Sequence, residues 1–416
     1  MLIPSLLRIM LTRSFQPFTF KGKQQVELDF AAIQDLGLYL HIPFCRSLCS
    51  FCPYNKVLYD EQLAEQYRAA LIKEIDLVGS QLEIKKPVTS LYIGGGTPAL
   101  MADSLKEIID TIKKYFTIEQ GIGVELHPDD INPQTITLLQ EAGAGMISVG
   151  IQSFNRQCLA ALGRAENDYS LALELLSRSG FEVIDIDLIF AIPGQTDQML
   201  LNDIETAFGL GATQVSTYPF IEFPFNRNGC RPLSAHDKKQ MLRAIAKHCE
   251  QSGRERTSVW TFALANTAKY SSVTRDYFLG FGASATTLLD GEFNINTFSI
   301  EAYIERMHSN RLPTSLSLSF TLRQRAVYHL FWNAYALKID PFRFEVIVGR
   351  PLSELFGFEL WIAQKLNLLS RKNGCYYLTT KGALYYHYLE QAYTHAYISK
   401  TWEICRATPF PQKITL

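Results

Sequence analysis

Short apolar segments alternate with amphipathic helical segments from residue 38 to about residue 250, and no other feature limits the possible folds as strongly. An alternation of this kind predicts a parallel sheet with helices outside it. Six such units can form an open, partial barrel, whose chemistry lies at the carboxyl ends of the strands. The expected strands are Leu38–His41, Ser90–Ile93, Gly123–Leu126, Met146–Ile151, Val183–Leu188 and Gln214–Tyr218. The expected helices are Glu61–Val78, Ala102–Tyr115, Pro133–Glu141, Tyr169–Arg178, Thr196–Leu210 and Ala235–Gln251.

The rest of the chain follows other patterns, so we expect an α/β protein with four parts. After the partial (β/α)6 barrel comes an irregular segment, which we expect to complete the active site. The last part is mainly helical, and its order of helix, strand and helix is typical of a winged-helix layout. The parts are residues 1–37, an N-terminal extension; residues 38–252, the barrel; residues 253–321, the irregular segment; and residues 322–416, the helical domain. The winged-helix pattern comprises Glu359–Ser370, Gly374–Leu378 and Lys381–Gln391.

The charge of the chain argues against nucleic acid as the main partner. The 416 residues carry a formal net charge of −1, whereas nucleic-acid-binding proteins usually show a basic excess. Aromatic residues make up 12% of the chain, which suits a pocket for a large conjugated ring and suits aromatic core packing equally well. We therefore expect a small-molecule substrate and no nucleic acid.

The first residues, MLIPSLLRIMLTRSF, are apolar but are interrupted by Arg8 and Arg13. This segment is too short and too broken to span a bilayer, and no small-residue cleavage site follows it. We expect it to pack on the barrel or to be frayed, with contact to a membrane surface as the alternative. The sequence thus predicts a cytoplasmic protein without a transmembrane segment.

Three of the eight cysteines, Cys45, Cys49 and Cys52, lie within eight residues, and the other five are scattered. A secreted disulfide framework would need a short chain and a signal peptide. Three thiolates at this spacing can bind three irons of a 4Fe–4S cluster, which normally takes four cysteines. The remaining iron is then open to a small ligand, as an open metal position is in catalytic zinc sites. Structural zinc and plain packing are the alternatives, but zinc would need a fourth Cys or His at finger-like spacing, and His41 lies within the preceding strand.

The segment YLHIPFC, which ends at Cys45, and the segment SFC, which ends at Cys52, resemble the radical S-adenosylmethionine (SAM) superfamily. Within it they are similar to the HemN-like branch. That branch contains oxygen-independent coproporphyrinogen III dehydrogenase (HemN), the haem chaperone HemW and the class C radical methyltransferases. The resemblance extends from about Leu38 to Pro313. It implies a radical SAM barrel, a 4Fe–4S cluster whose ligands are the three clustered cysteines, and an electron donor such as flavodoxin or ferredoxin.

Further residues match the SAM site of this branch. Most of them end a strand or follow one, where a carboxylate can bind ammonium or hydroxyl groups and a guanidinium can bind a carboxylate. The glycine run Gly94–Gly96 lets the backbone approach a ligand, although a tight turn is the commoner explanation of such a run. The resemblance implies two SAM molecules. It places Tyr39, Gly95, Glu125, Gln152, Arg164 and Asp187 at the first, Phe51, Gly96 and Thr97 at the second, and Thr286 after a later glycine-rich loop near both.

Departures from the branch bear on the reaction. Tyr54 stands where the dehydrogenase has a fourth cysteine, and Met146 stands near the place of a frequent arginine. The stretch Ala268–Arg275 replaces a His-Asn…Tyr-Trp stretch of the haem chaperone and looks more like the class C methyltransferases. In this superfamily an electron from the cluster cleaves SAM to a 5′-deoxyadenosyl radical. The sequence therefore favours methyl transfer to a conjugated ring, such as a tetrapyrrole, quinone or natural product. The alternatives are coproporphyrinogen dehydrogenation and a haem-binding chaperone.

Overall fold

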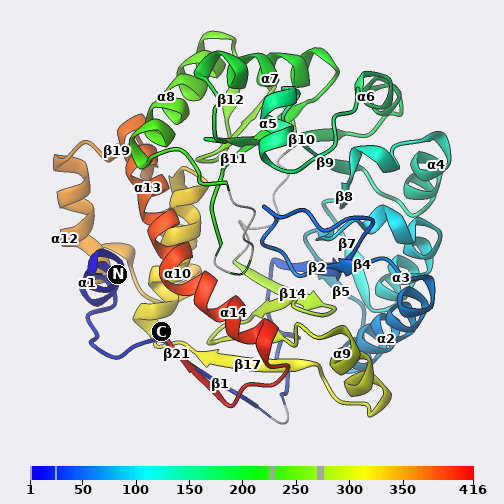
Figure 1. The fold of residues 1–416 in the computed structure, drawn as a ribbon. Coiled ribbons are helices and arrows are strands. Elements are labelled where there is room, and N and C mark those ends of the chain that lie inside the picture. Colours follow the sequence, from blue (N-terminus) through cyan, green and yellow to red (C-terminus); the bar gives the residue numbers. More distant parts are fainter. Residues whose placement is uncertain (1, 24–25, 224, 226–229, 269–275) are drawn as a thin grey trace.

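The computed structural model describes residues 2–23, 26–223, 225, 230–268 and 276–416. Six parallel strands lie side by side in the order β2, β6, β8, β9, β10 and β11, with helices outside them (Figure 1). The prediction of a partial (β/α)6 barrel is therefore confirmed. The strand bounds are β2 Leu36–Ile42, β6 Leu91–Gly95, β8 Ile122–Leu126, β9 Met146–Gln152, β10 Val183–Phe190 and β11 Gln214–Pro219.

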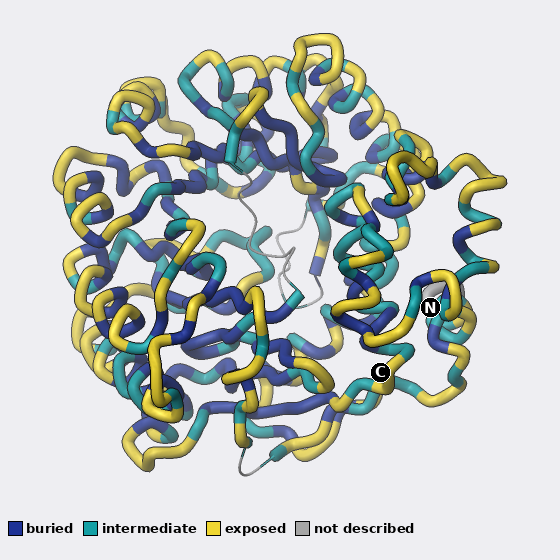
Figure 2. The backbone as a smooth tube through the Cα atoms, turned by 180° about the vertical axis from the view of Figure 1, so that it is seen from behind, coloured by how far each residue is buried: buried dark blue, intermediate teal, exposed yellow. Residues whose placement is uncertain are grey.

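Most of the barrel helices begin where a side chain caps the first turn, whereas α3 and α6 have no such cap. Asp60 accepts a hydrogen bond from the N–H of Leu63 in α2, and Thr196 accepts one from Met199 in α7. In Figure 2 the buried segments lie around the middle of the molecule and the exposed ones lie at its periphery, as expected for strands covered by amphipathic helices. The helix bounds are α2 Glu61–Gly79, α3 Ala102–Tyr115, α4 Pro133–Glu141, α5 Arg156–Ala161, α6 Ser170–Ser177, α7 Asp197–Gly209 and α8 Ala235–Gln251.

The segment 253–321, expected to be irregular, instead contains regular strands that extend the sheet on both sides. The strand β14 pairs with β2 in parallel and continues the barrel, whereas β15, β16 and β17 follow it in antiparallel order. These strands were missed because β12, β13 and β15 have only two or three residues, and because the alternation of apolar and polar residues in β16 (EFNIN) and β17 (TSLSLS) was not used. Their bounds are β12 Glu255–Arg256, β13 Thr261–Ala263, β14 Tyr277–Phe281, β15 Thr286–Leu288, β16 Glu292–Asn296 and β17 Thr314–Ser319, with α9 Ile300–His308 between the last two.

The C-terminal domain is mainly helical and has the expected winged-helix-like layout. The hairpin of β19 and β20 follows α12 and precedes α13, and β18 pairs with the outer side of β20. The bounds are α10 Leu322–Tyr335, β18 Lys338–Ile339, α11 Pro341–Val348, α12 Leu352–Lys365, β19 Leu369–Lys372, β20 Cys375–Leu378, α13 Thr380–Tyr393 and α14 Ser399–Ala407. A π-helical turn, Thr394–Ile398, joins the last two helices.

Both ends of the chain are tied to other parts of the fold. The strand β1 (Thr19–Lys21) pairs with β17 and with β21 (Lys413–Thr415). The first helix, α1 (Leu2–Thr12), packs against α10 and α13. The sequence had instead predicted that this segment packs on the barrel. Arg323 on α10 fixes its end by donating from Nε to Leu11 O at 2.7 Å. Among the described residues, no helix combines the length and the apolar character that a membrane span requires.

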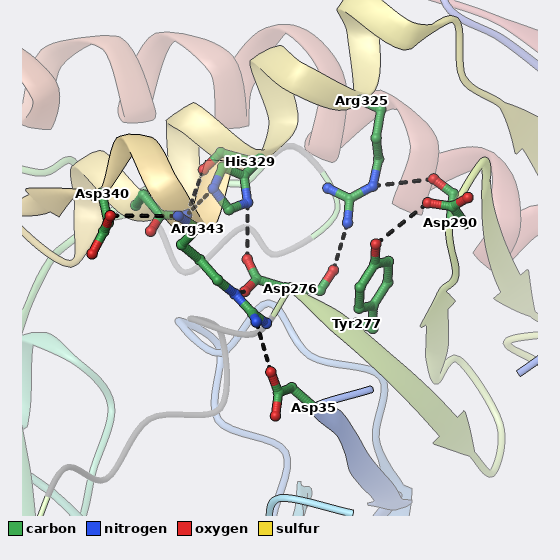
Figure 3. A network of polar contacts seen from close by, with 9 residues as sticks. Asp35, Asp276, Tyr277, Asp290, Arg325, His329, Asp340 and Arg343 are labelled. Carbon is green, nitrogen blue, oxygen red and sulfur yellow. Dashed lines mark hydrogen bonds and ion pairs between the residues drawn. The ribbon is translucent and has the colours of Figure 1, made fainter. Parts of the chain in front are cut away.

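Ion pairs join the C-terminal domain to the amino ends of β2 and β14 (Figure 3). Oδ1 of Asp276 lies 2.9 Å from Nδ1 of His329 on α10, and its Oδ2 accepts a hydrogen bond from Nε of Arg343 on α11 at 2.7 Å. Arg343 also donates from Nη1 to Asp35 at 2.6 Å, and Arg325 donates from Nη2 to Asp276 O at 2.7 Å. The C-terminal domain is thus fixed at the end of the sheet opposite to the strand carboxyl ends.

We expect Asp276→Asn to lower the free energy of unfolding by roughly 2 kcal/mol at pH 7, because His329 and Arg343 lose their anion. Burial opposes ionisation of Asp276, but these two partners outweigh it and lower its pKa to about 2. The unfolded pKa is about 3.9, so the contribution is present above pH 4 and is lost as the pH falls toward 2. Urea unfolding of cluster-free protein at pH 7 and pH 3 measures the difference.

The matched control is Asp35→Asn, because Asp35 shares Arg343 but its side chain is 55% exposed. Its cost should stay below about 1 kcal/mol. Equal stability of the wild type and the Asp276→Asn variant at pH 7 would contradict the role given to this network.

Candidate cluster and cofactor site at the mouth of the barrel

The cysteine loop, residues 45–52, leaves the sheet just after the carboxyl end of β2. A short parallel pairing between β3 (Phe44–Cys45) and β4 (Val57–Leu58) closes the base of the loop. All three of its cysteines are free and half-buried. The loop therefore presents three thiols at the end of the sheet where barrel chemistry is expected. They are Cys45, Cys49 and Cys52.

The thiols do not form a site for a single metal ion. Within the described ranges, no group of three or more His, Cys, Asp or Glu side chains could hold one. Burial raises the pKa of Cys45 to about 11 and also raises that of Cys52, so a metal would have to displace their protons. A 4Fe–4S cluster takes its cysteines on separate irons, so the thiols need not meet at one point. Free, half-buried thiols fit such a cluster, whose presence remains a prediction.

The first glycine loop, Gly94–Thr97, ends β6 and lies against the cysteine loop. The N–H of Thr97 donates to Phe44 O at 2.7 Å, and the Thr97 hydroxyl lies 3.8 Å from Sγ of Cys45. A Cβ on Gly96 would lie only 2.5 Å from Phe44 O, so this position has no room for a side chain. The two predicted loops therefore form one continuous surface.

Three of the predicted SAM residues come together beside this surface. Glu125 on β8 accepts hydrogen bonds from the N–H of Gly95 at 3.0 Å and from the hydroxyl of Tyr92 at 2.6 Å. The ring of Tyr39 stacks on that of Tyr92, with centroids 6.2 Å apart. Burial raises the pKa of Glu125, and its hydrogen bonds oppose this effect. Because both oxygens already accept hydrogen bonds, the carboxylate is held in place before any ligand binds.

Gln152 and Asp187 lie at neighbouring strand ends. The register between β9 and β10 shifts after Asp187, so that Gln152 pairs with Leu188. Gln152 has a φ of +74°, which costs of order 1–3 kcal/mol for a residue with a side chain and is most often found at functional sites. Asp187 accepts a hydrogen bond from Ser148 at 2.7 Å. The strain at Gln152 independently marks a position that the resemblance had singled out.

The remaining predicted residues are less closely grouped. Arg164 reaches back to the end of β9 and donates from Nη1 to Gly150 O. Thr286 begins β15, and its carbonyl would lie 2.2 Å from a Cβ on Gly280. Phe51 instead packs with an apolar cluster of α5 and the end of β10, so its part in a second SAM site stays a prediction. That cluster comprises Cys158, Leu162, Ile189, Ile192 and Phe220.

Two side chains of α2 that we had not predicted hold the second glycine loop, residues 279–285. Glu74 accepts a hydrogen bond from the N–H of Gly282 at 2.7 Å and another from Tyr303 at 2.7 Å. Tyr67 donates to His41 O at 2.8 Å and thereby links this part of the fold to β2. A carboxylate and a hydroxyl on the apolar stripe of an amphipathic helix were the signal available in the sequence.

Asp185 is a second acidic residue that the sequence analysis missed. It lies two residues before Asp187, on the same face of β10, in a strand that is otherwise apolar. Its Oδ2 accepts hydrogen bonds from Gln214 at 2.7 Å and Ser216 at 2.8 Å, whereas its Oδ1 is buried and has no hydrogen-bond partner among the described residues. Burial raises the pKa of Asp185 to about 6, and burial together with repulsion from Asp185 raises that of Asp187. This acidic pair suits a ligand that donates hydrogen bonds.

Comparison with known proteins places this site in a family. The radical SAM superfamily profile matches residues 39–207. The haem chaperone HemW of Lactococcus lactis is 31% identical over 349 residues, which cover 77% of this chain and 89% of that protein. HemW of Bacillus subtilis is 28% identical over 364 residues, which cover 83% and 96%. The oxygen-independent coproporphyrinogen III oxidase of Pseudomonas aeruginosa is 25% identical over 306 residues, which cover 67% and 66%.

A solved structure agrees with these relatives. Coproporphyrinogen III oxidase (HemN) of Escherichia coli has a TM-score of 0.76 and is 21% identical, with 94% of this chain and 98% of that chain covered. The barrel, the cysteine loop and the glycine loops therefore define a radical SAM protein. The chain belongs to the HemN-like branch of that superfamily. These relatives carry the two alternative functions and give no support to methyl transfer, which the sequence had favoured.

We expect alanine at any of the three loop cysteines to abolish binding of the cluster, because each thiolate would hold a separate iron. Anaerobically reconstituted wild-type protein should contain about four irons and four sulfides per chain. Cys158→Ala and Cys375→Ala are matched controls, since both residues are free cysteines outside the loop. Iron and sulfide analysis with the visible spectrum measures the outcome. Full iron content in the loop variants would show that the cluster lies elsewhere.

We expect Glu74→Gln to remove a pH dependence of stability. Burial raises the pKa of Glu74 to about 7, above the unfolded value of about 4.3, so the folded protein favours the protonated form. Wild-type stability should fall by roughly 3 kcal/mol between pH 4.5 and pH 7.5 relative to the Gln variant. Glu74→Ala should cost about 3 kcal/mol or more, because three donors lose their acceptor.

The control for this comparison is Glu65→Gln, which changes an exposed carboxylate on the same helix. Urea unfolding curves at several pH values provide the measurement. Parallel pH profiles for the wild type and Glu74→Gln would refute the assignment of this titration to Glu74.

Proposed function

We propose that this protein holds a 4Fe–4S cluster and SAM at the barrel mouth and binds haem in the manner of the chaperone HemW. The observation that carries this proposal is the extent of the similarity. In sequence the chain aligns with 96% and 89% of two HemW proteins but with only 66% of the Pseudomonas oxidase, whereas the match to HemN of Escherichia coli, which covers 98% of that chain at 21% identity, supports the shared fold alone. Tyr54, at the place of the fourth cysteine of the dehydrogenase, agrees with it.

In this proposal most of the predicted site residues have a defined task. Cys45, Cys49 and Cys52 would hold the cluster, which when reduced supplies the electron that cleaves the carbon–sulfur bond of SAM. Glu125 and Asp187 offer carboxylate oxygens to the ammonium or hydroxyl groups of the ligand. These carboxylates are already oriented by hydrogen bonds from Gly95, Tyr92 and Ser148. The protein thus fixes and shields the ligand before any electron arrives.

Other residues would complete the ligand sites. Arg164 offers a guanidinium to the SAM carboxylate. Gly96 and Thr97, together with Phe51, would contact a second SAM molecule, and Thr286 would lie near both molecules, as the resemblance implies. No residue is assigned as the haem ligand. The stretch Ala268–Arg275 replaces the His-Asn…Tyr-Trp stretch of HemW, and its residues 269–275 lie outside the described residues. We also propose that a flavodoxin or ferredoxin donates the electron and that the protein is cytoplasmic.

Oxidation of coproporphyrinogen is the second candidate. It is favoured by the similarity to the Pseudomonas oxidase, which spans 67% of this chain. Methyl transfer to a conjugated ring would use the same SAM site but would release different products. The three functions can therefore be separated by what the protein releases.

A single anaerobic assay distinguishes them. Reconstituted, reduced protein is incubated with SAM and either haem, coproporphyrinogen III or a quinone, and the products are separated by chromatography. We expect stoichiometric haem binding, measured by a spectral titration, with little 5′-deoxyadenosine and no S-adenosylhomocysteine. The Cys45→Ala variant provides a control without the cluster.

Two outcomes would overturn the chaperone function. Methionine and 5′-deoxyadenosine formed together with a decarboxylated porphyrinogen would establish the dehydrogenase. S-Adenosylhomocysteine formed in step with a methylated product would establish a methyltransferase. Thr97→Val would then test the second SAM site, because S-adenosylhomocysteine should fall more than 5′-deoxyadenosine does.

A further inference from the structure

The last helix of the C-terminal domain, α14, lies against the cysteine loop. In Figure 1 it runs beside the middle of the barrel, far from α12 of the same domain. Its Arg406 donates from Nη2 to Pro53 O, directly after Cys52, at 2.7 Å. Its Trp402 contacts the ring of Tyr54, with centroids 6.1 Å apart. A helix more than 340 residues later in the chain therefore contacts Pro53 and Tyr54, directly after the cysteine loop.

Arg406 is half-buried and has no carboxylate partner in the part of the chain that the structure describes. Its guanidinium lies 4.7 Å from the ring centre of Phe225 and 5.9 Å from that of Phe298. Its Nε is buried and has no hydrogen-bond partner among the described residues. Burial lowers the pKa of Arg406, and the nearby Cys52 thiol opposes this effect. A partly buried guanidinium without a counter-charge is costly unless an anion completes the site.

A second cation, Lys56, lies beside the same cysteine. Lys56 donates from Nζ to Cys52 O at 2.6 Å. Its ammonium group also lowers the pKa of the Cys52 thiol, which burial raises. No ion pair between Lys56 and an acidic side chain is present in the described residues. Two cations thus bind the backbone at Cys52 and Pro53, and neither has an acidic partner among the residues that the structure describes.

We propose that Arg406 and Lys56 complete the cluster site by supplying positive charge on the Cys52 side. Reduction adds one negative charge to a cluster already bound to three thiolates. Cations beside Cys52 stabilise this more negative state, and hydrogen bonds and net charge near the sulfurs are known to set such potentials. The C-terminal domain therefore acts on the cluster through α14. The proposal rests on the cluster assignment and goes beyond it by naming the groups that tune it.

The test measures the cluster itself rather than turnover. Arg406→Met and Lys56→Met are compared with the wild type in an anaerobic redox titration followed by electron paramagnetic resonance. Each substitution should lower the ratio of reduced to oxidised cluster about tenfold at a fixed potential. For a one-electron couple this corresponds to a midpoint shift of about 59 mV to more negative values. Arg406→Lys should restore most of the loss, because it keeps the charge.

The control is Lys400→Met, since Lys400 is an exposed cation on the same helix. It should leave the midpoint unchanged. If Arg406→Met fails to fold, Lys56→Met tests the proposal alone, because Lys56 does not lie on α14. Iron content distinguishes failure of the cluster assignment from failure of the role given to the cations. Wild-type protein without iron would refute the cluster assignment. Normal iron content with unchanged midpoints in both methionine variants would refute only the role of the cations.

The same variants exclude a competing role for Arg406. Its guanidinium could instead await a carboxylate of a bound tetrapyrrole. The test measures the affinity for a tetracarboxylate porphyrin. If the Arg406→Met variant binds it at least tenfold more weakly than the wild type while the midpoint potential is unchanged, the proposal is overturned in favour of substrate binding. Unchanged porphyrin affinity with a lowered midpoint would support it.

Discussion

Parallel pairing between β2 and β6 continues beyond the ends of both strands, and the candidate site depends on this continuation. Gly96 N donates to Ile42 O and Thr97 N donates to Phe44 O, both at 2.7 Å. These bonds require Gly96 to approach the backbone of Phe44 so closely that a Cβ would collide with it. The cysteine loop and the glycine loop are consequently fixed relative to each other. Any ligand shared by the two loops meets one rigid surface rather than two independent ones.

Around this surface the fold buries more carboxylates than stability alone would favour. Glu125 lies on β8, and Asp185 and Asp187 lie on β10, with β9 between the two strands; burial raises the pKa of each carboxyl. Such groups are costly without partners, and perturbed carboxylates of this kind gather at functional sites. Hydrogen bonds from Tyr92, Ser148 and Ser216 hold them in place. The arrangement suits the ligand proposed above, SAM, which carries an ammonium group and hydroxyls.

The C-terminal domain is attached to the barrel at two opposite places. At the amino ends of β2 and β14, Asp276 binds His329 and Arg343 in a network that makes the attachment specific. At the carboxyl ends, α14 reaches the cysteine loop through Arg406 and Trp402. Since the domain is held at both ends, its last helix has a defined position beside the cysteine loop. This gives a mainly helical appendage a physical connection with the chemistry of the barrel.

The sequence by itself determined the barrel, because buried parallel strands are continuous apolar runs and their helices are amphipathic. It also determined the cysteine loop, whose spacing is local. Tertiary structure alone decided what depends on contacts between distant segments. It placed β14 beside β2, turned residues 253–321 into strands and brought Glu74 to Gly282, 208 residues away. It also set Arg406 against Pro53, 353 residues away. The strand pairings join short, distant segments through backbone hydrogen bonds, and the side-chain contacts of Glu74 and Arg406 each depend on a partner that the fold chooses, so no local pattern in the sequence predicts them.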